Sequence, residues 1–164
     1  MSYLLDANVF ISAKNLHYGL DFCPAFWEWL IHAGNTGTVF SIDKVADEIE
    51  AGGDDLSAWA RGSGLALFRR THGALAPQLG QVSAWAMAQQ YTPAAINIFL
   101  QGADYYLVAH ALAGGHTVVT QEKPSPSPNR IKIPDACVGL GVRFMAPWQM
   151  LRIERARFVL ELAA

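Results

Sequence analysis

The stretch Tyr3-Leu4-Leu5-Asp6-Ala7-Asn8 opens the chain with three apolar residues that are followed at once by polar ones. A compact apolar run bounded by turn formers is typical of a short strand buried in a parallel sheet. The stretch therefore predicts a strand over 3–5 and a polar turn over 6–8, with Asp6 at the carboxyl end of the strand. In an α/β fold the carboxyl ends of the strands meet at one edge of the sheet, where ligands bind.

Short apolar runs alternate with helical patterns along the rest of the chain, with glycine and proline between them. We expect further strands at 38–42, 65–68, 116–120 and 142–145. We expect helices at 24–33, 56–61, 77–90, 93–100, 102–113 and 134–140, one that carries Val45 and Ile49 and is capped by Ser41 or Asp43, and a terminal one from Pro147 onward. Strands that alternate with helices predict an α/β fold of three layers, α/β/α, with a mostly parallel central sheet.

Size and composition predict a single domain that spans residues 1–164. The chain has 52% hydrophobic residues, which is ample for one core. Its apolar runs fall short of the roughly 20 residues that span a bilayer, and the first residues lack the basic and apolar regions of a signal peptide. Cys23 and Cys137 form no CxxC pair, so neither a zinc knuckle nor a disulfide framework is indicated. We therefore expect a cytoplasmic protein with reduced thiols and no membrane segment.

Charge is divided unevenly along the chain, although the net charge is only −2. Residues 1–122 hold five Lys or Arg against eleven Asp or Glu, a net charge of −6, whereas residues 123–164 hold seven against three, a net charge of +4. Basic residues beside an acidic set would attract a phosphate backbone to a metal held by the acids. Ordinary solvated charges on a loop and on the last helix are an equally good interpretation.

Five acidic residues lie near the ends of predicted elements or on a helix beside them: Asp6, Glu48, Asp104, Glu122 and Asp135. Carboxylates that meet at one sheet edge repel one another, and a divalent metal is a reason to keep them together because hard cations prefer carboxylate oxygens. Each residue alone has a plainer interpretation: Asp6 as a turn former, Asp104 and Asp135 as helix caps, and Glu48 as a charge on a solvated helix face. The ordered co-occurrence of the first four favours a shared metal site, and Asp135 is left open between a ligand and a helix cap.

Five segments in order resemble the PIN-domain ribonucleases, and among them the VapC-like toxins: Leu4–Ile11, Val45–Ile49, Asp104–Ala111, Val118–Glu122 and Gly141–Leu151. In that family the first strand ends in an aspartate followed two residues later by a small polar residue, here Asp6 and Asn8. The next segments are similar to the family's glutamate helix, its aspartate-led helix and its strand ending in Thr-x-Asp. The last resembles the closing strand, proline and helix. Together these weak motifs span nearly the whole chain.

The resemblance implies a PIN-like fold and a ribonuclease that uses Mg²⁺ or Mn²⁺ and leaves 5′-phosphate and 3′-hydroxyl ends. It implies that Asp6, Glu48, Asp104 and Glu122 are catalytic and that these four, with Asp135, hold the metal. Asn8 and Thr120 are expected to orient a carboxylate or a metal-bound water, and Lys123, Arg130 and Lys132 to bind the substrate backbone. Small proteins of this family are commonly toxins of type II toxin–antitoxin pairs, which makes RNA and a cognate antitoxin the expected partners.

Two features depart from the family pattern. Glu122 stands where the family usually has aspartate, so its longer side chain reaches the metal directly, through water, or not at all. A proline-rich loop at 123–134 then separates Glu122 from Asp135, which leaves open which of the two completes the site. A branch of the family with a lengthened loop that uses Asp135 fits this arrangement.

Other functions and partners also follow from the sequence. A non-catalytic PIN-like module that binds RNA or protein is the main alternative, because the altered Glu122 could leave the site unable to hold metal. A phosphatase of the haloacid dehalogenase type needs a second aspartate where this chain has Asn8, which disfavours it. The aromatic-rich helix at 24–33 is a candidate homodimer face. The tryptophans, Trp148 among them, fall on predicted helices, where packing is commoner than base stacking.

Overall fold

A five-stranded parallel sheet forms the centre of the computed structural model, which describes residues 1–162. Its strands are β1 (Tyr3–Leu5), β2 (Val39–Ile42), β3 (Phe68–Arg69), β4 (Thr117–Val119) and β5 (Phe144–Met145), in the spatial order β3-β2-β1-β4-β5. All neighbouring strands are parallel, and Tyr3 of β1 lies opposite both Val39 of β2 and Thr117 of β4. The carboxyl ends of the strands therefore share one edge of the sheet.

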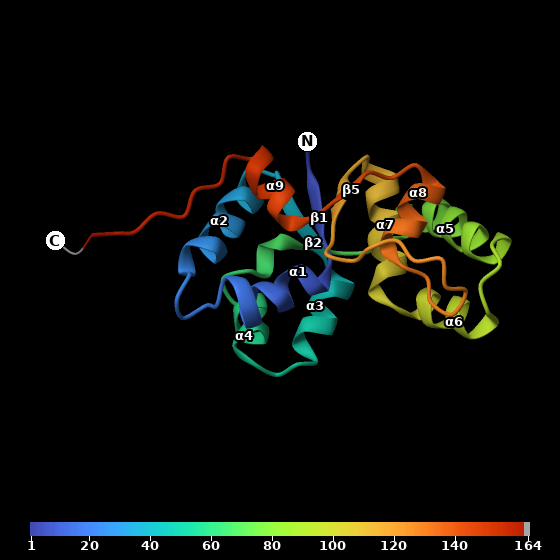
Figure 1. The fold of residues 1–164 in the computed structure, drawn as a ribbon, viewed down its shortest axis with the longest axis horizontal. Coiled ribbons are helices and arrows are strands. Elements are labelled where there is room, and N and C mark those ends of the chain that lie inside the picture. The colour runs from blue at the N-terminus through green and yellow to red at the C-terminus, as the bar shows by residue number, and fades with distance from the viewer. Residues whose placement is uncertain (163–164) are drawn as a thin grey trace.

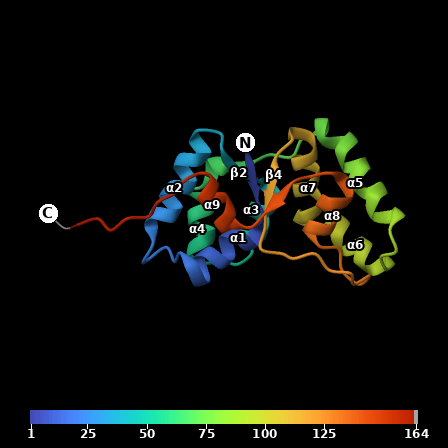
Figure 2. The same ribbon diagram turned by 45° about the horizontal axis from the view of Figure 1, so that its top comes forward.

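Helices cover both faces of this sheet. They are α1 (Ala7–Ser12), α2 (Pro24–Asn35), α3 (Asp43–Glu50), α4 (Asp55–Arg61), α5 (Ala76–Ala88), α6 (Pro93–Gln101), α7 (Ala103–Gly114), α8 (Ile133–Leu140) and α9 (Pro147–Ile153), with a π-helical turn η1 (Ala13–His17) and 3-10 turns η2 (Leu65–Leu67) and η3 (Gly73–Leu75). α1, α2, α4 and α9 lie on one side of the sheet, and α5, α6, α7 and α8 lie on the other (Figure 1, Figure 2). The predicted three-layer α/β/α architecture is confirmed.

The central strands are buried along their whole length. Every residue of β1, β2 and β4 is buried, which requires that both faces of the sheet be covered. Leu30 of α2 and Leu107 of α7 are completely buried on opposite layers and belong to one continuous core. Gly115 ends α7 with φ of 67°, a left-handed conformation that glycine adopts without a steric penalty. α7 is thereby fixed against the sheet with its first turn at the carboxyl edge.

The polar turn predicted at 6–8 is wrong, because α1 begins at Ala7, directly after Asp6. Val9 and Phe10 of α1 are each only 1% exposed. Burial of these two side chains outweighs the turn preference of the Asp-Ala-Asn sequence, as tertiary packing often overrides local propensity. Asp6 therefore lies at a direct strand-to-helix junction, with extended backbone and little freedom to move.

The cap predicted for α3 is also wrong. Ile42 precedes the helix, and neither Ser41 nor Asp43 caps it. The Ser41 hydroxyl instead donates to the Leu5 carbonyl at 2.6 Å inside the core. Asp43 accepts hydrogen bonds from the backbone N–H and the hydroxyl of Thr71, at 2.9 and 2.8 Å. Distant partners thus engage both side chains, and the local sequence contains no sign of them.

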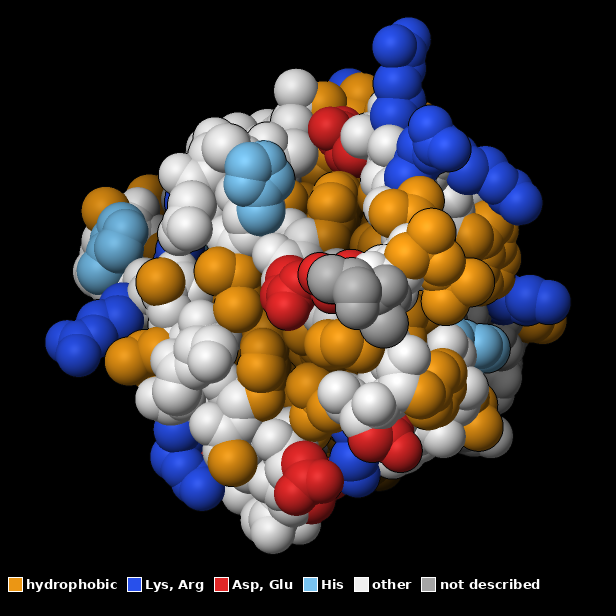
Figure 3. Space-filling view, turned by 90° about the vertical axis from the view of Figure 1, so that its left-hand side faces the viewer, with side chains coloured by type: hydrophobic (Ala, Val, Ile, Leu, Met, Phe, Trp, Pro, Cys, Tyr) orange, Lys and Arg blue, Asp and Glu red, His pale blue; other side chains and the backbone are white. Residues whose placement is uncertain are grey.

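Two more boundaries differ from the predictions. Most of the strand expected at 65–68 is the 3-10 turn η2, and β3 pairs only through Phe68 and Arg69. The terminal helix α9 ends at Ile153, and the chain that follows has no regular structure up to residue 162. In that segment Phe158 packs edge-on against Tyr18 and Phe26, whereas Leu160 and Leu162 are exposed. Figure 3 shows the hydrophobic side chains exposed on this side of the molecule.

Within residues 1–162, no helix combines the length and the apolar character needed to cross a membrane.

Candidate active site

Asp6 is held at the carboxyl end of β1 by contacts with β4. Its backbone N–H donates to the Val119 carbonyl at 3.0 Å, and the Thr120 hydroxyl donates to Asp6 Oδ2 at 3.0 Å. Both side chains are buried, with Asp6 3% and Thr120 2% exposed. The Glu122 N–H donates in turn to Thr120 Oγ1 at 3.1 Å. Thr120 therefore lies between the two acids and fixes the orientation of the Asp6 carboxylate.

Asp104 and Glu48 approach the same edge from two helices. Asp104 lies in the first turn of α7, where the helix dipole favours negative charge, and Glu48 lies on α3, which packs against α7. The two residues line one cavity of about 370 Å³. The opposite walls of that cavity come from α6 and from the proline-rich loop, through Ala95, Ile98, Phe99, Gly102, Asn129, Arg130 and Ile131. Glu48 and Asp104 therefore open onto this cavity.

The pKa values of the two central aspartates show that the acids act on one another. Burial is the main cause that raises the pKa of Asp104 to about 8, and the charges of Asp6, Glu122 and Glu48 raise it further. Burial likewise raises the pKa of Asp6 to about 7, against the lowering effect of the hydrogen bond from Thr120, and the charges of Glu122 and Glu48 raise it further. A carboxylate cluster of this kind gains from a cation placed among its oxygens.

Glu122 holds the proline-rich loop through both of its carboxylate oxygens. Its Oε2 accepts a hydrogen bond from the Ile133 N–H at 2.9 Å, at the beginning of α8. Its Oε1 forms ion pairs with Arg130 at 3.5 Å and Lys132 at 4.0 Å, and the side chain is only 8% exposed. The additional methylene of glutamate therefore lets this side chain join β4 to the far end of the loop.

Asp135 lies in the first turn of α8, on a different side of the loop. Its Oδ2 accepts a hydrogen bond from the Ser125 N–H at 3.1 Å. Burial raises the pKa of the nearby Tyr91, and the charge of Asp135 raises it further. The loop is also tied to α6, since the Thr92 N–H donates to the Pro128 carbonyl at 3.0 Å. The structure thus brings Asp6, Glu48, Asp104 and Glu122 together, and it places Asp135 as an anchor of the loop.

Comparison with models of protein families shows to which family the chain belongs. A family model described as "Domain of unknown function (DUF4411)" matches residues 3–158. The chain belongs to this family. No curated protein sequence matches it significantly.

Two solved structures have the same fold as this DUF4411 chain. VapBC2 from Rickettsia felis, bound to a DNA fragment from its promoter, is 14% identical with a TM-score of 0.56, over 89% of this chain and 98% of the other. FitAB bound to the IR36 DNA fragment is 16% identical with a TM-score of 0.51, over 89% and 95%. These likenesses confirm the predicted PIN-like fold.

Carboxylate oxygens from four elements are the donor type that Mg²⁺ and Mn²⁺ bind, so the chemistry of the site fits such an ion. Among residues 1–162, however, no three Asp, Glu, His or Cys side chains are arranged closely enough to ligate one ion as they stand. A bound ion would have to draw the carboxylates of this DUF4411 chain together.

The remaining predicted site residues lie around the acids. Asn8 is exposed on α1, and Arg130 lines the cavity with Glu48 and Asp104. Lys123 lines a neighbouring groove of about 360 Å³ together with Thr120 and Glu122. Sequence reasoning missed the α6 wall of the cavity, formed by Ile98 and Phe99. Nothing in the local sequence distinguishes these two side chains from ordinary core positions, since only the fold brings α6 beside α3.

Proposed function

We propose that this protein is a metal-dependent endoribonuclease that hydrolyses RNA phosphodiester bonds. The observation that carries the proposal is the meeting of Asp6, Glu48, Asp104 and Glu122, from four separate elements, at the carboxyl edge of the sheet, where the pKa values of the two aspartates are raised. Keeping like charges together lowers the stability of the fold, and clusters that bear this cost are typical of functional sites. Hydrolysis at a polyanionic backbone supplies one.

Asp6, Glu48 and Asp104 would hold Mg²⁺ or Mn²⁺, with Glu122 as the fourth carboxylate, while Asp135 holds the loop. Such an ion lowers the pKa of bound water and stabilises the negative charge that develops at phosphorus. Thr120 keeps the Asp6 carboxylate in one orientation through its hydrogen bond at 3.0 Å. The Arg130 side chain is 64% exposed and lines the cavity. Its guanidinium can therefore leave the ion pair with Glu122 and bind a phosphate group instead.

We further propose that the protein is the toxin of a type II toxin–antitoxin pair. The resemblance to VapC-like toxins supports this role, and so do the two-component complexes VapBC2 and FitAB that share the fold. A cognate antitoxin would then restrain the nuclease by covering the acidic cavity. RNA is the proposed substrate, and the basic residues Lys123, Arg130 and Lys132 would position its backbone.

The test is a cleavage assay with purified protein, single-stranded RNA and Mg²⁺ or Mn²⁺. Glu48→Gln keeps the size of the side chain and removes its charge, so the rate should fall about 10- to 100-fold if an ion uses this carboxylate. Glu50→Gln is the matched control, because Glu50 is also exposed on α3 and lies outside the cavity. Equal rates for the two variants, or no metal-dependent cleavage by the unaltered protein, would contradict the proposal.

Thr120→Val is expected to lower the cleavage rate about 10- to 100-fold, because it removes the hydrogen bond that orients Asp6. Thr117→Val on the same strand is the matched control, since the buried Thr117 hydroxyl has no hydrogen-bond partner among the described residues. Both variants should keep a thermal unfolding midpoint close to that of the unaltered protein. Similar activity of the two valine variants would exclude an orienting role for Thr120.

A non-catalytic module that binds RNA or protein is the second candidate. Two observations favour it: both oxygens of Glu122 are engaged by the loop, and no three acids are arranged to ligate an ion as they stand. Isothermal titration separates the two functions. Micromolar to millimolar binding of Mg²⁺ or Mn²⁺ that disappears in Glu48→Gln supports the nuclease, and no heat of binding supports the module.

A further inference from the structure

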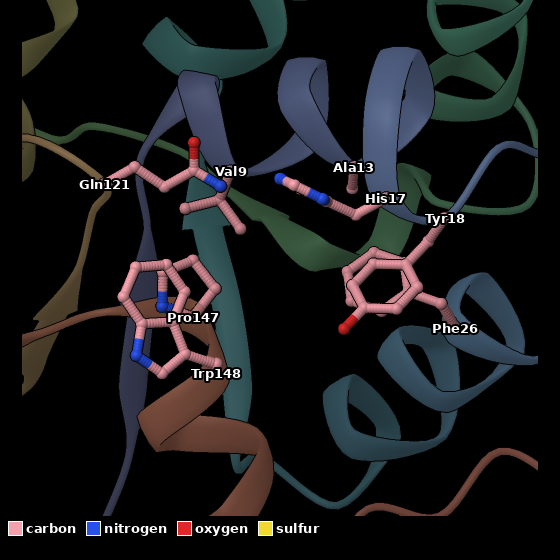
Figure 4. Close-up of a pocket in the computed structure, with 8 residues that line it drawn as sticks. All are labelled: Val9, Ala13, His17, Tyr18, Phe26, Gln121, Pro147 and Trp148. Carbon is pink, nitrogen blue, oxygen red and sulfur yellow. The ribbon is translucent and has the colours of Figure 1, made fainter.

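A small aromatic pocket lies beside the acidic cluster, and none of the residues that line it has a role in the proposed catalysis. It has a volume of about 130 Å³ and is lined by Val9, Ala13, His17, Tyr18, Phe26, Gln121, Pro147 and Trp148 (Figure 4). These residues come from α1, η1, α2, the end of β4 and the first turn of α9. Ligand sites for drug-sized molecules usually enclose about 300–1,000 Å³. The smaller pocket admits one planar ring system.

The pocket is joined to the acidic cluster through the chain itself. Gln121 follows Thr120, which binds Asp6, and precedes Glu122. Val9 lies in the first turn after Asp6, and its N–H donates to the Asp6 carbonyl at 3.1 Å. Gln121 and Trp148 also line the groove that contains Thr120, Glu122 and Lys123. The pocket is therefore continuous with the groove beside Glu122, and a strand bound along that groove would pass its mouth.

The walls of the pocket suit a flat ring with polar edges. Tyr18 stacks on Phe26 with ring centroids 4.5 Å apart and planes 14° apart, so its phenol ring is supported from behind. The Trp148 indole is 52% exposed, and it has no aromatic neighbour among residues 1–162. Figure 4 shows Trp148 and Tyr18 on opposite sides of the pocket, with Gln121 and His17 at its upper rim. The amide and the imidazole can donate and accept hydrogen bonds there.

We propose that this pocket binds one nucleobase of the RNA strand whose backbone lies over the acidic cluster. The inference rests on the proposed function, in which RNA is the substrate, and it adds the site at which one base of the strand is bound and distinguished from other bases. Aromatic side chains stack on unpaired bases of any sequence, and polar groups at the edge of such a pocket discriminate between them. Trp148 is then a stacking residue, and Gln121 is the residue that selects the base.

The experiment measures binding separately from cleavage. Fluorescence anisotropy is recorded with 5′-fluorescein-labelled, eight-nucleotide single-stranded RNAs in an Asp6→Asn background, which prevents cleavage. Trp148→Ala should raise the Kd about 10-fold, as loss of one stacked base does, and Trp148→Phe should restore most of the affinity. Phe22→Ala is the control and should leave the Kd unchanged, since Phe22 is a 66% exposed aromatic outside the pocket.

A second set of RNAs carries an abasic site at each position in turn. At one position the abasic site should weaken binding to the protein that has Trp148. The same abasic site should have no effect in Trp148→Ala, because the stacking contact is already lost. Equal Kd values for Trp148→Ala and Phe22→Ala would contradict the proposal that the pocket binds a base. So would a Trp148→Ala variant that weakens only the complex with the antitoxin proposed above, since the pocket would then bind protein.

Cleavage by the variants with Asp6 intact keeps the two proposals apart. If RNA binds through Trp148 but is never cut, the result contradicts the proposed nuclease function and supports base binding in the pocket. RNA that is cut but binds equally well without Trp148 contradicts the pocket and leaves the nuclease in place. A protein that neither binds nor cuts RNA overturns both.

Discussion

Asp104→Asn is expected to lower the rate of RNA cleavage by about 100- to 1,000-fold. The carboxylate at the first turn of α7 is close enough to Asp6, Glu48 and Glu122 for their charges to raise its pKa. An ion held by this cluster, as proposed, would stabilise the transition state by several kcal/mol, and each 1.36 kcal/mol corresponds to a factor of ten in rate. Asparagine keeps the shape of the side chain but loses the charge that holds the ion. Initial rates with labelled single-stranded RNA at saturating Mg²⁺ measure the effect.

Asp55→Asn is the control for this measurement. Asp55 occupies the first turn of α4 as Asp104 occupies the first turn of α7, so the change in helix-dipole interaction is matched, but Asp55 is exposed and lies outside the acidic cavity. Its variant should cleave RNA at the unaltered rate. If Asp104→Asn retains more than about a tenth of the activity, the metal-dependent mechanism loses its central ligand and the proposal has to be abandoned.

Asp6→Asn is expected to stabilise the protein in metal-free buffer at pH 8, by about 2–4 kcal/mol. The folded pKa of Asp6 is raised from 3.8 to about 7 by burial and by the neighbouring acids. Between these values the folded protein retains a proton that the unfolded chain has lost, so the free energy of unfolding falls as pH rises through this range. A shift of one pKa unit corresponds to about 1.36 kcal/mol. Asparagine removes this penalty and can still accept the hydrogen bond from Thr120.

Thermal unfolding with EDTA measures the gain, which corresponds to about 5–10 °C in Tm for a chain of this size. The difference between Asp6→Asn and the unaltered protein should shrink as the pH falls from 7 toward 3.8, and it should be lost below 3.8, where Asp6 is protonated in both states. Adding Mg²⁺ should raise the Tm of the unaltered protein and not that of the variant. An Asp6→Asn variant that is less stable than the unaltered protein at pH 8 would show that the carboxylate is not under repulsion.

The fold was largely predictable because the sheet is parallel and buried. Strands such as Tyr3–Leu5 and Thr117–Val119 are covered on both faces, so they are continuous apolar runs that stand out between glycines and prolines. Proline and glycine also mark the ends of helices such as α2 and α7. The α1 helix was missed because its beginning, Asp6-Ala7-Asn8, has the composition of a turn, and only the burial of Val9 and Phe10 makes it helical.

The sequence could predict that the acids lie near one another, and it could not predict their contacts. The order of Asp6, Glu48, Asp104 and Glu122 along the chain, with the expected topology, was enough to place them at one edge. The sequence left Glu122 and Asp135 as alternatives for the fourth ligand. The folded loop separates them: Glu122 lies within the electrostatic range of Asp6 and Asp104, while Asp135 holds the Ser125 N–H.

Trp148 illustrates the limit of a sequence pattern. Its place on a predicted helix favoured packing in a core or an interface, and the helix was predicted correctly. Whether an aromatic side chain on a helix is buried depends on which face meets the sheet, and here the indole remains 52% exposed beside a pocket. The opposite wall comes from Tyr18, which lies far away in sequence.

The sequence by itself determined the alternation of strands and helices, the parallel sheet and the set of acids, because periodicity, turn residues and residue type act locally. The tertiary structure alone decided which of those acids interact electrostatically, how the loop is held and where a small pocket opens beside them. These features depend on contacts between different segments of the chain, such as Thr120 with Asp6 and Glu122 with the Ile133 N–H. Burial at that contact gives an ordinary aspartate an unusual pKa.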